Sequence, residues 1–193
     1  MPFQSKSKSD SVTYAKLSEA ALRLLVRREH SELELRNKLK QKFPREVLYP
    51  ATHSEQAHAS SLDAQPSYEP LPIQDALDIL VGELINQDLL SDERFTENLI
   101  NSRLRRGYGP LYVRRELQQK GVSEKVAKPH LDQVKDRWLD EAQDQIARRF
   151  PEAAQSRQMW AKAARFLERR GFDRGTISEL LGRIPEESEG DSR

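Results

Sequence analysis

The sequence lacks cysteine entirely: none of its 193 residues is one. This absence excludes disulfides, thiolate-bound zinc and a cysteine nucleophile. Long apolar runs are missing too, since none approaches the roughly 20 residues that a membrane-spanning helix needs. No apolar stretch follows the lysines near the N-terminus, as a signal peptide would require. We therefore expect a cytoplasmic protein with no membrane segment.

Catalytic motifs are also missing. The four histidines, His30, His53, His58 and His130, are scattered, and none has H-x-x-x-H or H-E-x-x-H spacing. The glycine turn at 107–110 has neither the G-K-[ST] nor the G-x-G-x-x-G pattern of a phosphate loop. No serine has the context of a nucleophile elbow. We predict a binding protein that is not an enzyme, with no catalytic residue, no cofactor and no metal site.

The pattern that is present is helical. Leu17, Ala21, Leu24 and Leu25 form one apolar helix face, and Ser31 begins a capping box before a second helix. Further helices are expected at 75–87, 92–106, 110–120, 123–134, 137–149, 157–170 and 174–182. Alternating β-branched runs are absent, so the sequence predicts an all-α fold without strands. Pro129 conflicts with the helix at 123–134, which either starts late, near Lys128, or bends there.

Segment 44–72 has a different composition. It holds five of the ten prolines and no glycine, and it has too few apolar residues to offset the entropy cost of ordering. We predict that it is a flexible insertion. The same reasoning predicts a flexible N-terminus at 1–13 and a flexible acidic tail at 185–193.

A weak internal repeat organises the rest. A shift of about 50 residues superposes Leu117 and Gly121 on Leu167 and Gly171, and a shift of about 78 superposes Leu17 on Phe95. The difference between the two shifts nearly equals the length of the insertion. The chain is therefore expected to hold three tandem three-helix repeats, at 14–90 (with the insertion), 91–135 and 136–184. The apolar fraction of 36% is low for one compact core, which favours an elongated body.

Charge is balanced overall but not locally. The net charge is +1, yet residues 103–120 carry six basic side chains and a single acid, Glu116. Arginine pairs recur at 27–28, 105–106, 114–115, 148–149 and 169–170. Such pairs either stabilise helix C-termini or line up as a basic strip for a nucleic-acid backbone or an acidic protein.

Tyr108 lies between two glycines beside these arginines, in the sequence RRGYGP. Two interpretations remain open. The ring contacts a partner, by stacking on a base or by entering a pocket. Alternatively, it packs the corner between two helices, as His30 would at the matching position of the first repeat.

Three blocks resemble the RecX family of bacterial regulatory proteins. The first runs from Ala21 and Leu25 through Arg28, Ser31 and Glu34-Leu35 to Lys38-Leu39. The second comprises Leu90, Asp92, Arg94-Phe95, Arg103, Gly107 and Gly109. The third comprises Val113, Glu116-Leu117 and Gly121-Val122. The resemblance covers 15–43 and 73–183, and it implies three repeats of three helices in a curved, elongated body. The insertion departs from the family's short connection.

The resemblance also implies a function. Proteins of this family bind the filament of the RecA recombinase on single-stranded DNA and inhibit its ATPase, strand-exchange and coprotease activities, which modulates recombination and the SOS response. We expect a monomer that binds RecA, with DNA contact as a further option. The alternative is a helical regulator that acts by binding nucleic acid directly. The expected binding surface consists of Arg103, Arg105, Arg106, Tyr108, Arg114, Arg115 and Lys120. The family motif supports only Arg103, Gly107 and Gly109 directly, and charge supports the other residues.

Overall fold

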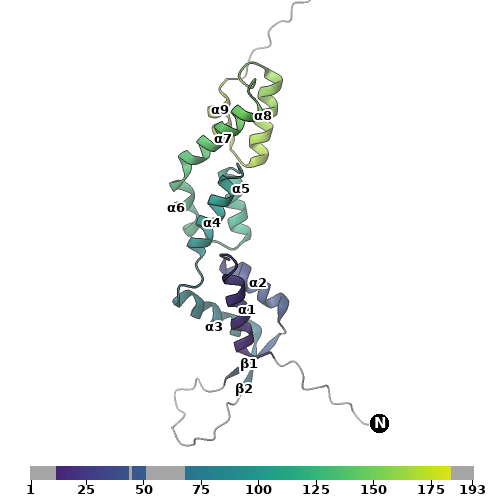
Figure 1. Ribbon diagram of the computed structural model, residues 1–193, viewed down its shortest axis with the longest axis vertical. Helices are drawn as coiled ribbons and strands as arrows, with labels where there is room; N and C mark the ends of the chain where they lie inside the picture. Colours follow the sequence, from purple (N-terminus) through teal and green to yellow (C-terminus); the bar gives the residue numbers. More distant parts are fainter. Residues whose placement is uncertain (1–11, 44, 51–67, 184–193) are drawn as a thin grey trace, which may run out of the picture. The chain divides into compact units, whose positions relative to one another are not determined.

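The computed structural model describes residues 12–43, 45–50 and 68–183 (Figure 1). The chain divides into two compact units, Met1–Ser91 and Asp92–Arg193. The described elements of the first unit are α1 (Tyr14–Leu25), α2 (Glu32–Lys42), β1 (Glu46–Pro50), β2 (Tyr68–Pro72) and α3 (Ile73–Asn86). Those of the second unit are α4 (Asp92–Leu104), α5 (Pro110–Gln119), α6 (Glu124–Gln133), α7 (Lys135–Arg149), α8 (Arg157–Arg170) and α9 (Arg174–Leu181).

The helical fold class is confirmed, and the helix limits follow local signals in the sequence. Ser31 is the N-cap of α2, where its hydroxyl accepts a hydrogen bond from the Glu34 amide at 3.1 Å. Pro110 begins α5, because its missing N–H is of no use in the first turn. Gly171 ends α8 in the left-handed conformation that glycine adopts without strain. Helices α1–α3, α4–α6 and α7–α9 form three successive three-helix groups.

The prediction of no strands is wrong. The edges of the predicted insertion pair as an antiparallel two-stranded sheet, with Val47 opposite Leu71. Val47 is only 2% exposed, because its side chain joins the core of the first unit. Burial of one valine and the ladder of backbone hydrogen bonds thus order the strands despite their prolines, which stand mostly at strand ends. Residues 51–67 of the predicted insertion lie outside the described residues.

The start of the first unit differs from expectation in the same way. Val12 and Thr13, within the predicted flexible N-terminus, have defined contacts. The Val12 carbonyl accepts a hydrogen bond from the Leu48 amide at 2.8 Å, and Thr13 caps α1. The other predicted flexible residues, 1–11 and 185–193, lie outside the described part of the chain.

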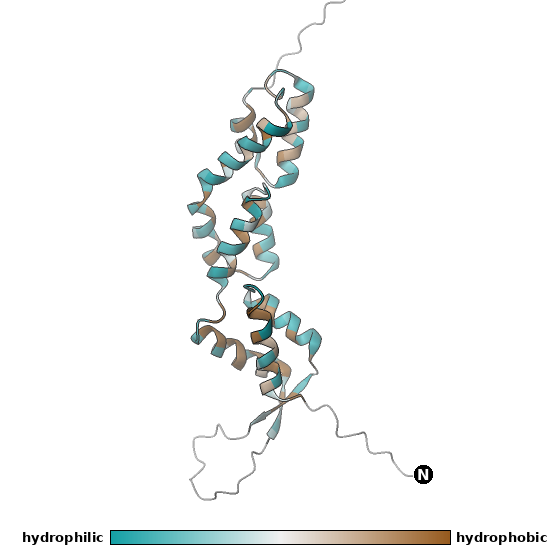
Figure 2. Cartoon of the chain, viewed as in Figure 1, coloured by the Kyte–Doolittle hydropathy of each residue, from teal (hydrophilic) through white to brown (hydrophobic). Residues whose placement is uncertain are grey.

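Each unit has its own core (Figure 2). The first core is built mainly from α1, α2 and α3, and α3 is the most continuously apolar helix in the picture. The second core runs without a break through both later repeats, from Phe95 on α4 to Leu181 on α9. Repeats two and three therefore share one apolar interior, as neighbouring solenoid repeats do.

Pro129 lies inside α6, which begins at Glu124 behind the N-cap Ser123. The late start near Lys128 is therefore wrong. Within the residues described, no helix combines the length and apolar character needed to cross a bilayer.

Candidate functional site

The candidate site begins at the glycine turn between α4 and α5. Gly107 has φ +70°, a left-handed conformation, and a Cβ atom there would overlap the side chain of Gln145 on α7. Gly109 is the N-cap of α5, and a Cβ atom there would lie 2.6 Å from the carbonyl oxygen of Gly171. Both glycines are needed because the turn packs directly against the third repeat.

Two backbone hydrogen bonds fasten this turn to the third repeat. The Gly109 amide donates to the Arg170 carbonyl at 2.7 Å, and the Leu111 amide donates to the Gly171 carbonyl at 3.0 Å. In return, the Arg170 guanidinium donates to the Arg106 carbonyl. The α4–α5 turn and the α8–α9 turn are therefore held at a fixed separation.

Tyr108 lies half-buried at this junction. Its ring stacks on Tyr112, with ring centroids 4.2 Å apart, and the Arg170 guanidinium lies 4.7 Å from the Tyr108 centroid. The ring also packs against the core of the second unit. The side chain thus packs in the corner between α4 and α5 and is engaged by two neighbours.

Beside Tyr108 opens a cleft of about 560 Å³, which we call the basic cleft. It is lined by five arginines, one carboxylate, one amide and one tyrosine: Arg105, Arg106, Arg148, Arg149, Arg170, Glu141, Gln145 and Tyr108. Arginine presents a planar fork of donors that fits carboxylate and phosphate oxygens. The cleft therefore has the chemistry of an anion-binding site.

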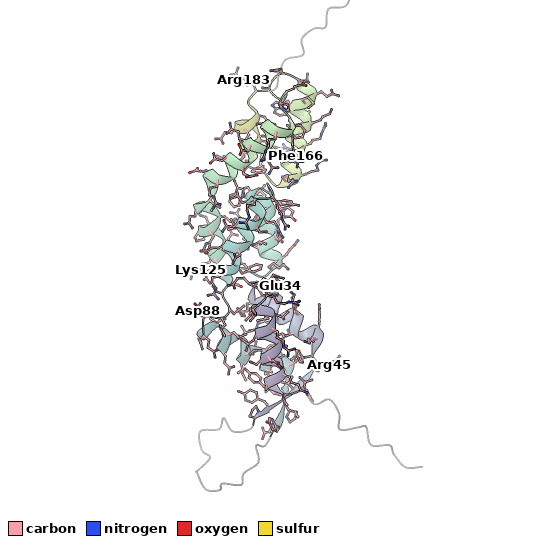
Figure 3. The ribbon with its side chains drawn as sticks, viewed as in Figure 1. Glu34, Arg45, Asp88, Lys125, Phe166 and Arg183 are labelled. Atoms are coloured by element: carbon pink, nitrogen blue, oxygen red, sulfur yellow. The ribbon has the colours of Figure 1, made fainter. Side chains whose placement is uncertain are left out.

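The arginines of the cleft are held in different ways. Arg149 lies over the Phe166 ring at 5.3 Å, and Arg170 lies over the same ring at 5.2 Å. Phe166, on α8, is labelled in Figure 3. Arg148 donates to the Asp144 carbonyl at 3.1 Å. Aromatic faces thus orient the guanidinium groups of Arg149 and Arg170, and a carbonyl orients that of Arg148.

Arg105 and Arg106 follow the last residue of α4, and both side chains are exposed. Within the described residues, no ion pair neutralises either guanidinium. The one carboxylate of the cleft, Glu141, accepts a hydrogen bond from Gln145 at 3.1 Å and lies 3.8 Å from the Arg148 guanidinium. Positive charge therefore prevails in the cleft.

The structure divides the residues of the predicted binding surface, which were grouped because of their charge, into two sets. Arg105, Arg106 and Tyr108 line the basic cleft, but Arg103, Arg114, Arg115 and Lys120 do not. Arg103 donates to Glu116 through Nε at 2.6 Å and through Nη2 at 2.5 Å. These hydrogen bonds raise the pKa of Arg103, which keeps it charged. Arg103 therefore ties α4 to α5.

The remaining predicted residues lie along α5 and at its end. The Arg114 guanidinium is 3.4 Å from the Glu124 carboxylate, a half-exposed pair. Arg115 is exposed, and Lys120 is the half-buried C-cap of the helix. They form a basic edge of α5 rather than part of the cleft.

Sequence reasoning did not include Arg148, Arg149 and Arg170 among the site residues. The signal was present, since the pairs 148–149 and 169–170 are visible in the sequence. What the sequence cannot give is that these pairs meet the 105–106 pair, which requires the packing of the third repeat on the glycine turn. No group of three or more His, Asp or Glu side chains within the described residues could hold a metal ion.

Comparisons with known proteins agree with this architecture. Family models described as the first, second and third three-helix domains of RecX match residues 19–48, 91–128 and 136–181. The regulatory protein RecX of Legionella pneumophila (strain Corby) is 34% identical over 170 residues, which cover 88% of this chain and 95% of that protein. The regulatory protein RecX of Cronobacter sakazakii is 34% identical over 163 residues, covering 82% and 86%.

A solved structure shows the same fold. The crystal structure of RecX from Lactobacillus salivarius superposes with a TM-score of 0.62 at 18% identity, covering 87% of this chain and 94% of that one.

Proposed function

Since the chain belongs to the RecX family of regulatory proteins, we propose that it is a negative regulator of RecA. It binds the RecA filament on single-stranded DNA and lowers the filament's ATPase, strand-exchange and coprotease activities. The observation that carries this proposal is the matching of all three family domains in order along the chain. The arginine-rich surface of the second unit supports it, because a nucleoprotein filament is a strongly anionic partner.

The arginines proposed to bind the filament are those of this surface that no carboxylate among the described residues neutralises. Arg105, Arg106 and Arg115 are exposed, whereas Arg103 is held by Glu116 and Arg114 lies near Glu124. A charge already paired within the protein gains less from a new anion than one that is free. Arg105 and Arg115 are therefore the sharpest positions for a test.

The test is a titration of RecA's DNA-dependent ATPase with the wild-type protein and with Arg105→Glu/Arg115→Glu. We expect the double variant to need about tenfold more protein for half-inhibition, which corresponds to about 1.4 kcal/mol. Arg165→Glu/Arg174→Glu, with the same charge change at exposed positions away from the cleft, is the matched control and should inhibit like the wild type.

Each result decides a separate point. No inhibition by folded wild-type protein would overturn the proposal of a RecA regulator. Full inhibition by Arg105→Glu/Arg115→Glu would leave that proposal standing and overturn the assignment of the surface.

A second candidate function is direct binding of nucleic acid, independent of RecA. The unneutralised pair Arg105 and Arg106 beside a turn favours it, because such guanidiniums suit a phosphate backbone. It predicts that the protein occupies DNA alone at the concentrations that inhibit RecA, with an affinity that falls steeply as salt rises. Inhibition well below those concentrations would reject it.

A further inference from the structure

The residues that line the basic cleft indicate which chemical groups it can bind. We propose that the cleft binds phosphate groups of a nucleotide chain through guanidinium groups alone, without stacking on any base. This inference rests on the proposed function and deepens it, because it names the part of the filament that the cleft would contact.

The first step is that the occupant must be anionic and polar. Among the lining residues, the five arginines face a single carboxylate, and none is aliphatic. A protein partner anchors itself mainly through buried aromatic and aliphatic side chains in apolar pockets. The only apolar side chain of the lining is Tyr108, whose ring Tyr112 and Arg170 already engage. A peptide would thus find cations but no anchor, which favours phosphate over an acidic protein segment.

The second step concerns how well the donors are placed in advance. Arg149 and Arg170 share the Phe166 ring, at 5.3 and 5.2 Å, and Arg170 also lies over Tyr108. An arginine stacked on an aromatic face keeps its donors at the edge of the guanidinium plane. Arg105 and Arg106 supply two further forks, and neither has an ion pair within the described residues. Two guanidinium groups oriented by aromatic rings, together with those of Arg105 and Arg106, can therefore bind successive phosphate groups. The oriented side chains need little further ordering to do so.

The third step excludes base stacking. Nucleic-acid proteins that stack bases present an open aromatic face. Here Tyr108 has Tyr112 at 4.2 Å and Arg170 at 4.7 Å, while Phe166 has two guanidiniums over it and Phe150 at 5.5 Å. The aromatic groups of the site therefore serve to hold arginines, and the cleft should not distinguish one base from another.

The decisive experiment compares two labelled 12-mers without RecA, using fluorescence anisotropy at low salt. One is oligo-dT and the other is an abasic phosphodeoxyribose strand of equal length. We expect their dissociation constants to agree within about twofold. One stacked base would make the abasic strand about 5- to 150-fold weaker, and that result would overturn the proposal.

Variants locate the binding. Arg105→Glu/Arg106→Glu should weaken binding of both strands at least tenfold and should reduce the salt slope by about 1.4, since each lost phosphate contact on a single strand removes about 0.7. Arg165→Glu/Arg174→Glu should leave affinity and slope unchanged. Equal weakening by both pairs would overturn the cleft as the site. If the glutamate pair fails to fold by circular dichroism, Arg105→Gln/Arg106→Gln carries the same test.

Competitors identify the source of the phosphate. If inorganic tripolyphosphate displaces the 12-mer at equal phosphate concentration, the cleft takes a free nucleotide's phosphates; if only longer strands displace it, the cleft takes a strand's backbone. Displacement by a polyglutamate peptide of equal charge, at equal concentration, would overturn the preference for phosphate. If no strand binds while RecA inhibition persists, this inference fails and the proposed function stands.

Discussion

Two interhelical corners at equivalent places in the repeats differ in how the following helix is capped and how polar groups are bonded. One uses side chains and the other uses backbone. The first corner joins α1 to α2 and comprises residues 26–31. The second corner joins α4 to α5 and comprises residues 105–109. In the first, the side chain of Ser31 caps the following helix, and His30 is 1% exposed. In the second, Gly109 is the cap and makes no side-chain cap bond.

The polar groups differ accordingly. At the first corner, the His30 Nδ1–H donates to the Arg28 carbonyl at 2.9 Å, and Nε2 accepts from Lys38 at 3.0 Å. Glu34, labelled in Figure 3, accepts from Arg28 at 2.5 Å and lies 3.2 Å from the Lys38 ammonium. The polar groups of the first corner thus form hydrogen bonds and ion pairs with side chains of the corner itself and of α2.

The second corner instead uses bare backbone. Gly109 donates to Arg170 of the next repeat, and the neighbouring Arg105 and Arg106 keep their positive charge exposed. Loss of side chains at the turn allows the third repeat to approach, and that approach assembles the basic cleft. The comparison teaches that glycine, rather than arginine alone, is what allows the basic cleft to form at the second corner.

The largest effect is predicted for a variant that disrupts the contact between the second corner and the α8–α9 turn. Gly171→Ala places a Cβ atom at φ +87°, 2.5 Å from the Tyr112 amide nitrogen, so backbone strain and overlap add. We expect the free energy of unfolding to fall by about 2–4 kcal/mol. Urea unfolding followed by the fluorescence of Trp138 and Trp160, both in the second unit, measures it.

The matched control lies in the first unit. Gly82 stands inside α3, where an added Cβ atom meets nothing within 4 Å. Gly82→Ala should therefore stabilise the first unit by about 0.5–1 kcal/mol, as measured by urea unfolding followed by circular dichroism. If Gly171→Ala had a wild-type unfolding midpoint, the close approach of the two turns would be contradicted.

A smaller effect is expected from the first corner's carboxylate. Glu34→Gln leaves Arg28 and Lys38 without the anion that neutralises them beside buried His30. Loss of these charge-assisted hydrogen bonds should cost about 2 kcal/mol. Urea unfolding followed by circular dichroism measures the loss. Glu19→Gln, in a pair with Arg23 whose side chains are 60% and 73% exposed, should cost less than about 0.5 kcal/mol.

The helix cap of the first corner contributes less again. Ser31→Ala removes the acceptor of the buried Glu34 amide and should cost about 1 kcal/mol in the same assay. Ser31→Asn, which restores a capping oxygen, should recover part of the loss. An unchanged stability in Ser31→Ala would show that the hydroxyl does not cap the helix.

The smallest effect depends on pH. Burial is the main cause that lowers the pKa of His30 below its ordinary 6.5, and the facing charges of Arg28 and Lys38 lower it further, while the Arg28 carbonyl and Glu34 oppose the shift. The unfolded chain therefore binds a proton at His30 before the folded chain does, and stability falls as pH drops below about 6.5.

The test compares the wild type with His30→Gln in urea at pH 7, 6 and 5. The other three histidines contribute equally to both proteins, so the difference isolates His30. We expect the wild type to lose more stability than His30→Gln on acidification. Parallel losses would show that His30 protonates equally in the folded and unfolded chain.

Much of the fold could be predicted because helix signals are local. The expected helix at 157–170 is α8 to the residue, and Ser31 was identified as a cap from its spacing to Glu34. The strands were not predicted because their pairing joins Glu46 to Pro72, across 26 residues of sequence. The prolines also obscure any alternation of apolar and polar residues. Long-range pairing leaves no local period.

The site was predictable in part for the same reason. Arg105 and Arg106 stood out by local charge, and they do line the cleft. The ion pair of Arg103 with Glu116 and the approach of Arg170 are tertiary contacts, so charge alone could not separate a structural arginine from a free one. The sequence left two interpretations of Tyr108 open, a partner contact or packing of the corner between two helices. The structure shows the ring packed in that corner, where the neighbouring glycines admit the third repeat.

The two backbone hydrogen bonds from Gly109 and Leu111 also govern where the chain can be divided. Helix α6 runs into α7 with only Val134 between them, and a fragment ending there would keep α4–α6 but lose both acceptors at Arg170 and Gly171. Repeats two and three thus form one inseparable building block despite matching two separate family domains. A domain exchange among relatives should cut the chain near Ser91, where the two compact units meet in sequence.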